Sequence, residues 1–174
     1  MFVRRLAATA LLAALALTTS ACSITGNVAS LQPYSPSDGQ QVDLESIKAR
    51  NFIYLVSESG QGFLIGSVVN TASESKIMKI QYEDPNTQAK TDYLVEVAAG
   101  GKLDFGYNGN PAIQMPVVEV PGQTAKFFFL ESDRISAGIK VPVLDGTLSE
   151  YKALIQLLEQ QMAPVPEPEE TPAN

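Results

Sequence analysis

The chain has 174 residues, with 12 lysines and arginines, 19 aspartates and glutamates, one cysteine and no histidine. Without histidine there can be no Ser-His-Asp triad, no Cys-His pair and no imidazole metal site, which excludes many families of enzyme. The formal net charge of −7 argues against nucleic-acid binding, which relies on lysine and arginine to neutralise phosphates. We therefore expect a protein that is not an enzyme and that binds no nucleic acid, metal or cofactor.

Residues 1–21 have the pattern of a lipoprotein signal peptide. Arg4 and Arg5 form a basic start, and the apolar run Leu6–Leu17 is shorter than the roughly 20 residues that span a bilayer. Small residues then lead into Cys22 as in a bacterial lipobox, although Thr19 stands where leucine is usual. We expect cleavage before Cys22 and lipidation of its sulfur. The alternative is an ordinary secreted protein that is cut at the same place.

The remaining chain is expected to consist of one domain between two unstructured segments. Residues 22–41 comprise the lipidated cysteine and a small, polar, proline-containing stretch that is typical of a flexible tether. Residues 162–174 are rich in proline and glutamate, which favours a disordered acidic tail. The domain then covers residues 42–161, and its lipid would hold it at the extracytoplasmic face of the cell membrane.

Eight short apolar segments separated by turns predict an all-β fold. Their number and spacing are typical of an antiparallel β-sandwich of the immunoglobulin or cupredoxin kind. A hairpin is predicted where Glu58-Ser59-Gly60-Gln61-Gly62 separates two of the segments, because glycine supplies the turn. The segments cover residues 47–57, 63–71, 76–82, 93–97, 103–107, 113–120, 125–130 and 139–144.

Residues 148–161 predict a single short amphipathic helix at the C-terminal end of the domain. Thr147-Leu148-Ser149-Glu150 matches a capping box, and apolar residues then recur at intervals of three and four. The apolar face includes Leu154 and Leu158. This face either closes one end of the sandwich or offers a surface to a partner or a membrane.

The aromatic run within residues 125–130 leaves two interpretations open. Alternate residues of a strand point to opposite sides, so Phe127 and Phe129 share one face. Either both faces of this strand are covered, or part of the run is exposed for a partner. Phe127, Phe129, Leu154 and Leu158 are therefore the possible interface residues.

Three stretches of the chain carry a resemblance to a known family. They are Ser35-Pro36-Ser37-Asp38-Gly39, Gly66-Ser67-Val68-Val69-Asn70 and, most specifically, Val141-Pro142-Val143-Leu144-Asp145-Gly146-Thr147-Leu148-Ser149-Glu150-Tyr151. Together with the lipobox and Arg50-Asn51, they resemble the actinobacterial LpqE family of lipoproteins over residues 35–155. The resemblance implies a small β-sandwich distantly related to periplasmic copper chaperones of the PCu(A)C type. Those chaperones hold Cu(I) with two histidines and two methionines, and the absence of histidine prevents any transfer of that site.

The resemblance also implies a partner. The mycobacterial member of the family is an accessory subunit on the outer face of the respiratory bcc-aa3 supercomplex, which joins a menaquinol–cytochrome c reductase to a cytochrome c oxidase. A similar accessory role is therefore expected for this chain. The alternative is a copper metallochaperone for the oxidase that uses Met78 and Met115, since thioethers bind Cu(I). Packing in the core is the other explanation for these two methionines.

Overall fold

The computed structural model describes residues 2–10, 35, 37–117, 119–132, 134–135 and 138–162. The chain divides into two units, Met1–Tyr34 and Ser35–Asn174. In the first unit, residues 2–10 form a helix. No helix in the described part of the chain is long and apolar enough to cross a membrane. Cys22, most of the predicted tether and the predicted tail from residue 163 lie outside the described residues.

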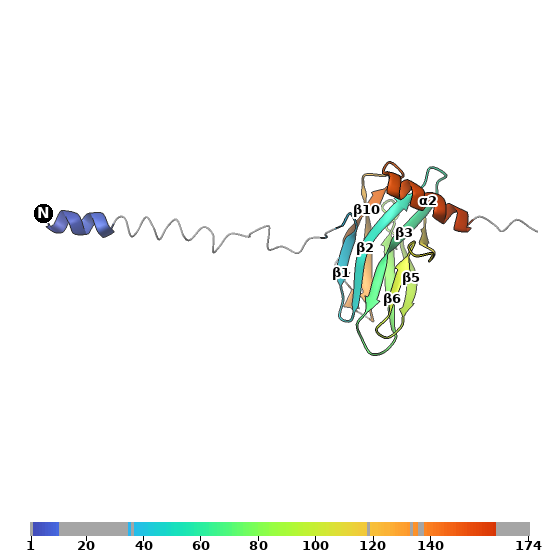
Figure 1. The fold of residues 1–174 in the computed structure, drawn as a ribbon, viewed down its shortest axis with the longest axis horizontal. Coiled ribbons are helices and arrows are strands. Elements are labelled where there is room, and N and C mark those ends of the chain that lie inside the picture. The colour runs from blue at the N-terminus through green and yellow to red at the C-terminus, as the bar shows by residue number, and fades with distance from the viewer. Residues whose placement is uncertain are drawn as a thin grey trace, which may run out of the picture. The chain divides into compact units, whose positions relative to one another are not determined.

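The described residues of the second unit form ten strands followed by a helix (Figure 1). Each of the eight predicted segments contains a strand, and β1 and β9 are additional. The elements are β1 (Gln40–Asp43), β2 (Ile47–Val56), β3 (Gly62–Asn70), β4 (Lys76–Glu83), β5 (Lys90–Val97), β6 (Lys102–Phe105), β7 (Ile113–Met115), β8 (Thr124–Glu131), β9 (Arg134–Ile135), β10 (Ile139–Leu144) and α2 (Ser149–Met162).

The strands form two facing sheets that are joined through β10. The strand order is β5-β4-β8-β10-β2-β3-β6, with β1 beside β2, β7 beside β3 and β9 beside β8. We name β1, β2, β3, β6 and β7 the helix-covered sheet, and β4, β5, β8 and β9 with the first part of β10 the open sheet. The predicted all-β sandwich with one C-terminal helix is confirmed.

The last strand changes sheet along its length. Ile139–Pro142 pair antiparallel with β8, whereas Val143 and Leu144 pair parallel with β2. Pro142 stands where the strand leaves one ladder for the other, and proline has no N–H to donate to a continuous ladder. The parallel pair corrects the expectation of purely antiparallel strands.

The main core lies between the two sheets. Phe52 and Tyr54 of β2 meet Phe129 and Phe127 of β8, with ring centroids 4.9 and 6.5 Å apart in edge-on arrangements. Such arrangements place the positive edge of one ring against the negative face of another. The aromatic run of β8 thus holds the sheets together.

A bulge in β2 inverts which of its side chains face the main core. Ile47 and Ala49 face the main core before Asn51, where the register shifts and φ is 52°. After the bulge the even-numbered Phe52 and Tyr54 face the main core instead, because an extra residue inverts the alternation of side chains. The segment after the bulge is a continuous apolar run, because its other face is covered by α2.

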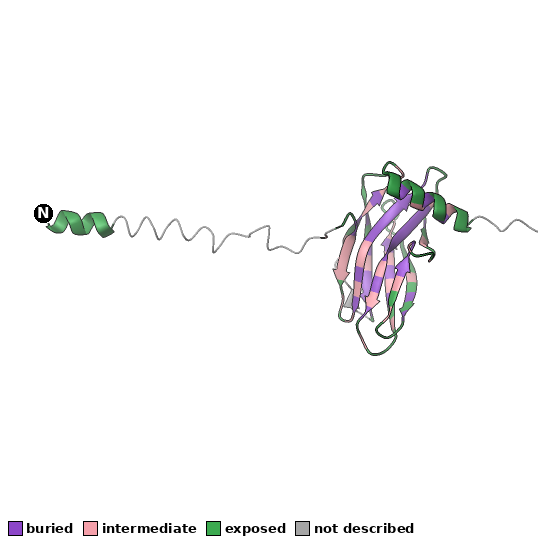
Figure 2. Ribbon diagram, in the orientation of Figure 1, coloured by how far each residue is buried: buried purple, intermediate pink, exposed green. Residues whose placement is uncertain are grey.

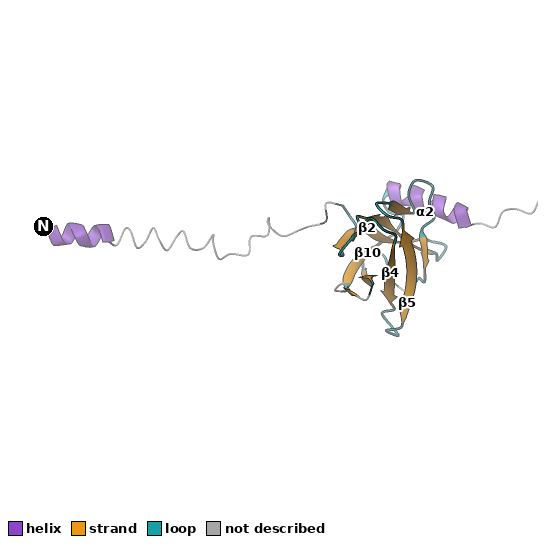
Figure 3. Ribbon diagram, turned by 90° about the horizontal axis from the view of Figure 1, so that it is seen from below, coloured by secondary structure: helices purple, strands orange, loops and turns teal. Residues whose placement is uncertain are grey.

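Helix α2 covers the outer face of the helix-covered sheet and creates a second core. Ile53, Leu55, Phe63 and Ile65 of the sheet pack against Tyr151, Ile155 and Leu158 of the helix. The predicted helix is confirmed, with bounds one residue later at each end. It lies across a face of the sandwich, where an end was expected. Figure 2 shows buried residues on β2 and β3 beneath the helix, and Figure 3 shows α2, β2 and β4 in successive layers.

The residues that lead into β1 are part of the folded unit. The Tyr151 hydroxyl of α2 donates to Asp38 Oδ2 at 2.6 Å, and the Gly39 N–H donates to Asn51 Oδ1 at 3.1 Å. Because β1 begins at Gln40, the first strand starts two residues before the predicted domain boundary at 42. Its short polar sequence carries little apolar alternation by which it could have been predicted.

Candidate functional site

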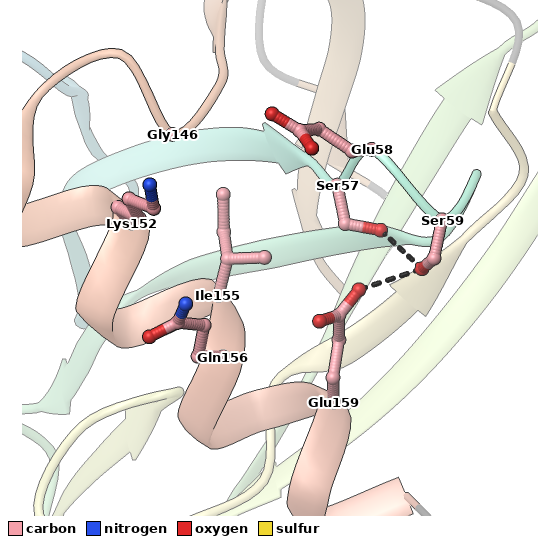
Figure 4. Close-up of a pocket in the computed structure, with 8 residues that line it drawn as sticks. All are labelled: Ser57, Glu58, Ser59, Gly146, Lys152, Ile155, Gln156 and Glu159. Carbon is pink, nitrogen blue, oxygen red and sulfur yellow. Dashed lines mark hydrogen bonds between the residues drawn. The ribbon is translucent and has the colours of Figure 1, made fainter.

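A cleft of about 250 Å³ lies between the β2–β3 turn, the β10–α2 connection and the exposed flank of α2 (Figure 4). The turn is the predicted hairpin, since the Ser57 N–H donates to the Gln61 carbonyl at 2.8 Å and Gly60 has a φ of 79°. The cleft brings together residues about 100 positions apart in the chain. Its walls are Ser57, Glu58, Ser59, Gly146, Lys152, Ile155, Gln156 and Glu159.

A chain of hydrogen bonds organises one wall of this cleft. The Gln61 N–H donates to Ser57 Oγ at 3.0 Å, and the Ser59 hydroxyl donates to Glu159 Oε1 at 2.6 Å. Ser57 Oγ and Ser59 Oγ lie 2.8 Å apart. Because the only hydroxyl proton of Ser59 is donated to Glu159, the hydroxyl of Ser57 is the donor in the hydrogen bond between the two serines. Figure 4 shows the Ser57 hydroxyl turned toward Ser59 and the Ser59 hydroxyl turned toward Glu159. A serine nucleophile normally relies on an adjacent imidazole, and the chain has none, so this geometry suits polar binding.

A second cavity of about 310 Å³ adjoins the cleft and shares Ser57, Glu58 and Gly146 with it. Asp145 and Pro121 complete its walls with Val56 and Thr147. Of the stretch Val141–Tyr151, which carries the family resemblance most specifically, Gly146 lines both cavities, and Asp145 and Thr147 line the second. Within the described residues, no group of three or more cysteine, aspartate or glutamate side chains could hold a metal ion.

An apolar groove of about 550 Å³ lies at the C-terminal end of α2. Tyr93 of β5 and Ile113 of β7 form its sides, where the edge strands of the two sheets approach each other. Leu158 and Met162 of the helix close the groove, and the Gln114 amide lies 3.0 Å from the Met162 sulfur. The groove offers few polar groups to orient a ligand.

Glu119 is a buried carboxylate with no cation beside it among the described residues. The Tyr82 hydroxyl donates to both of its oxygens at 2.8 and 2.9 Å. Burial raises the pKa of Glu119, and the hydrogen bond from Tyr82 only partly offsets this effect. Burial and then Glu119 also raise the pKa of Tyr82. The pair fixes the β7–β8 connection to β4.

Glu131 is a buried carboxylate of the opposite character. It accepts the N–H groups of Ser46 and Ile47 at 2.9 and 3.1 Å and also the Ser46 hydroxyl. Burial disfavours its charged form, but these hydrogen bonds outweigh that cost and lower the pKa of Glu131. The carboxylate ties the end of β8 to the β1–β2 turn. Both buried acids therefore have structural roles.

The structure places most of the predicted interface residues inside the protein. Phe127 is 0% and Phe129 1% exposed in the main core, so the interpretation in which they bind a partner is corrected in favour of burial. The reason is that both point inward between the sheets. Leu158 is 2% exposed beneath α2, and Leu154 is half-buried against the same cluster. The apolar face of the helix is thus occupied by the sheet.

Met78 and Met115 both lie in the main core, with exposed fractions of 0% and 7%. Their thioethers pack among the aromatic side chains between the sheets. This is the packing role that sulfur-containing side chains commonly have. Cys22 lies outside the described residues, so its predicted lipidation stays a prediction.

Sequence reasoning missed the outer face of the open sheet. Ile77 is 60% and Leu94 73% exposed on neighbouring strands, although both belong to segments predicted as strands. Lys79 of β4 lies opposite Leu94, whereas Lys90, Lys126 and Lys140 lie toward the other end of the same face. The alternation in residues 76–83 and 90–97 is the signal that could have indicated a solvent-exposed face.

Comparisons with known proteins find similarities of fold among solved structures. No family model matches this chain, and no curated protein matches it. A solved structure described as "Copper-bound PCuAC domain from PmoF2" matches with a TM-score of 0.45 and 14% sequence identity. The match covers 61% of this chain and 98% of that chain. No metal, activity or partner of that domain follows for this chain.

Proposed function

We propose that the chain is a lipoprotein, anchored through Cys22 to the outer face of the plasma membrane, that works as a non-enzymatic binding subunit. The partner would be the respiratory bcc-aa3 supercomplex, to which the chain would attach as an accessory subunit. The observation that carries the proposal is the single cysteine that follows the apolar run Leu6–Leu17 after four small residues, together with the stretch Val141–Tyr151.

The stretch Val141–Tyr151 has a structural place in the domain. It forms most of the strand that joins the two sheets, the connection to α2 and the first turn of that helix. The serines and the carboxylate of the nearby cleft form hydrogen bonds with one another and lack an imidazole to activate them. This chemistry favours a binding role for the domain over catalysis, and it does not single out the cleft as the binding surface.

A lipid anchor would also make a small interface sufficient. Confinement near the membrane raises the effective concentration of the domain around a membrane-embedded partner, so a modest intrinsic affinity gives high occupancy. The apolar face of α2 already packs against the sheet, so the partner would contact another exposed face of the domain.

The experiment is a mild-detergent pull-down from native membranes with an affinity tag after Asn174. We expect haems a, b and c to co-purify in a reproducible ratio with the bait, as measured by absorption spectroscopy and mass spectrometry. A tagged, unrelated lipoprotein of similar abundance is the control. Recovery of the bait alone, or only with cell-envelope proteins, would refute the respiratory partner.

A further inference from the structure

Among the described residues, no element covers the outer face of the open sheet, whereas α2 covers the corresponding face of the other sheet. Side chains from β4, β5, β8 and β10 form this face. Ile77 and Leu94 are diagonal neighbours on it, because Ile77 pairs with Glu96 and Lys79 with Leu94. Both are largely exposed. A flat face with exposed aliphatic side chains is a typical feature of protein contact sites.

A row of charges crosses the four strands of this face. Lys140 of β10 stands opposite Lys126 of β8, Lys126 opposite Glu83 of β4, and Glu83 opposite Lys90 of β5. We name Lys140, Lys126 and Lys90 the lysine row. Lys126 forms an ion pair with Glu83 at 2.7 Å. Among the described residues, no carboxylate lies within ion-pair distance of Lys90 or Lys140.

This arrangement costs stability in the isolated domain. Like charges directly opposite each other on neighbouring strands are destabilising, and Lys140 and Lys126 are such a pair. Phe128 sits between two members of the row, with Lys90 Nζ 4.7 Å and Lys126 Nζ 5.2 Å from its ring centroid. A half-buried aromatic ring flanked by cations is a ready contact for a carboxylate-bearing surface with an apolar centre.

The charge of the face contrasts with the charge of the rest of the chain. The face carries four lysines, Lys79 and the lysine row, against three carboxylates, Glu83, Asp92 and Glu96. The remainder of the chain after residue 21 carries six cations and 16 acids. An acidic partner would therefore be attracted to the open sheet and repelled by the rest of the molecule.

We propose that the outer face of the open sheet docks against a protein surface that presents carboxylates around an apolar contact. This inference rests on the proposed function, in which that surface belongs to the extracytoplasmic side of the membrane complex. A protein fits better than an anionic bilayer, because Asp92 and Glu83 are paired with lysines inside the face. These acids would be repelled by uniformly anionic headgroups.

The first test compares two matched lysines in the full lipidated chain. Lys140 and Lys152 are both exposed and both lack an ion-pair partner among the described residues. We expect Lys140→Glu to reduce the haem recovered per bait about tenfold, because its carboxylate would then face the carboxylates of the partner. The double variant Lys90→Glu, Lys140→Glu should reduce the recovery further for the same reason. Lys152→Glu, in the cleft beside α2, should leave recovery unchanged. Loss with Lys152→Glu alone would overturn the inference and assign docking to the cleft.

A carbodiimide cross-link tests the chemistry of the contact directly, because this reagent joins lysines only to carboxylates that touch them. On native membranes we expect cross-linked peptides at Lys140, Lys126 or Lys90, each joined to a partner peptide. Cross-links to the partner only at lysines outside the face would overturn the proposal. Circular dichroism of each variant verifies that the sandwich is folded.

The remaining outcomes separate this inference from the proposed function. If the wild-type chain pulls down a membrane protein without haem, the respiratory partner is wrong, and Lys140→Glu and Lys152→Glu still test whether the open sheet is the docking face. If the wild-type chain pulls down no protein, both the proposed function and the docking face are refuted. Flotation of the Cys22→Ser chain with phosphatidylglycerol vesicles should show no binding. Binding that Lys140→Glu abolishes would identify a lipid as the occupant and overturn the proposal.

Discussion

Glu131 shows how one buried carboxylate can hold two distant segments together. Its oxygens accept hydrogen bonds from the N–H groups of Ser46 and Ile47 in the turn between β1 and β2. The charged form is favoured because three hydrogen bonds converge on it. The turn between β1 and β2 is thus positioned by β8.

We predict that Glu131→Gln destabilises the domain by about 1–3 kcal/mol, because an amide presents one acceptor and a donor to groups that only donate. Urea unfolding at pH 7 measures this loss. Since the pKa of Glu131 is lowered in the fold, its stabilisation is complete above the ordinary glutamate pKa of about 4.3 and disappears as pH falls through the folded-state value. The difference in the free energy of unfolding between Glu131→Gln and wild type should therefore shrink as pH falls. Glu96→Gln, at an exposed acid that accepts from Ser75, is the control and should have little effect.

Glu119 should have the reverse dependence on pH. Its pKa is raised by burial, so its contribution to stability is complete below about pH 4.3 and is lost as pH rises through the folded-state value. We predict that Glu119→Gln, which can still accept from Tyr82, melts at a higher temperature than wild type at pH 8 and at a similar temperature at pH 4. Circular dichroism melts at the two pH values measure this. An unchanged difference between them would contradict the assignment.

Helix α2 owes its position to the apolar residues on one side. Leu158 is buried against the sheet, and the adjacent Leu157 is 46% exposed. We predict that Leu158→Ala costs about 2–5 kcal/mol by leaving a cavity, whereas Leu157→Ala changes stability by less than about 0.5 kcal/mol. Urea unfolding of the two variants provides a matched comparison. Equal losses would mean that the helix is not held by its packed face.

Local sequence patterns were sufficient to predict the individual strands and the helix of this fold, but they did not predict which strands pair with one another. The helix and the eight apolar segments follow from periodicity, and the hairpin at Gly60 follows from its turn residues. The short strands β1 and β9 escaped notice because they are only four and two residues long. The bulge at Asn51 inverts the faces of β2, which no alternation rule anticipates.

The candidate site was harder to predict than the fold, because it depends on which strands are neighbours. From sequence alone Phe127 is a candidate interface residue, whereas in the structure the opposite sheet covers it. The lysine row exists only in the observed register of β10, β8, β4 and β5, and β8 and β10 lie far from β4 and β5 in the chain. The cleft similarly joins Ser59 to Glu159 across 100 residues.

For the molecule as a whole, the lipid is predicted to be the main attachment to the membrane. Two or three acyl chains bind far more tightly than one, since each buried methylene adds about 0.8 kcal/mol. We predict that Cys22→Ser moves the protein from the membrane fraction to the soluble fraction, as measured by fractionation and immunoblotting. Ser23→Ala, next to the modified residue, should remain in the membrane fraction. Full retention of the Cys22→Ser chain would show that another contact is the main anchor.

The position of β10 between the two sheets has a consequence for folding. Residues 139–144 pair with β8 on one side and with β2 on the other, so they join ladders that are otherwise separate. A chain whose synthesis or transport has stopped before this strand lacks the link between its sheets. Contacts of such large sequence separation also slow the search for the native state. The sandwich therefore closes only after its last strand has arrived, and until then the apolar faces of β2 and β8 depend on other means of protection from aggregation.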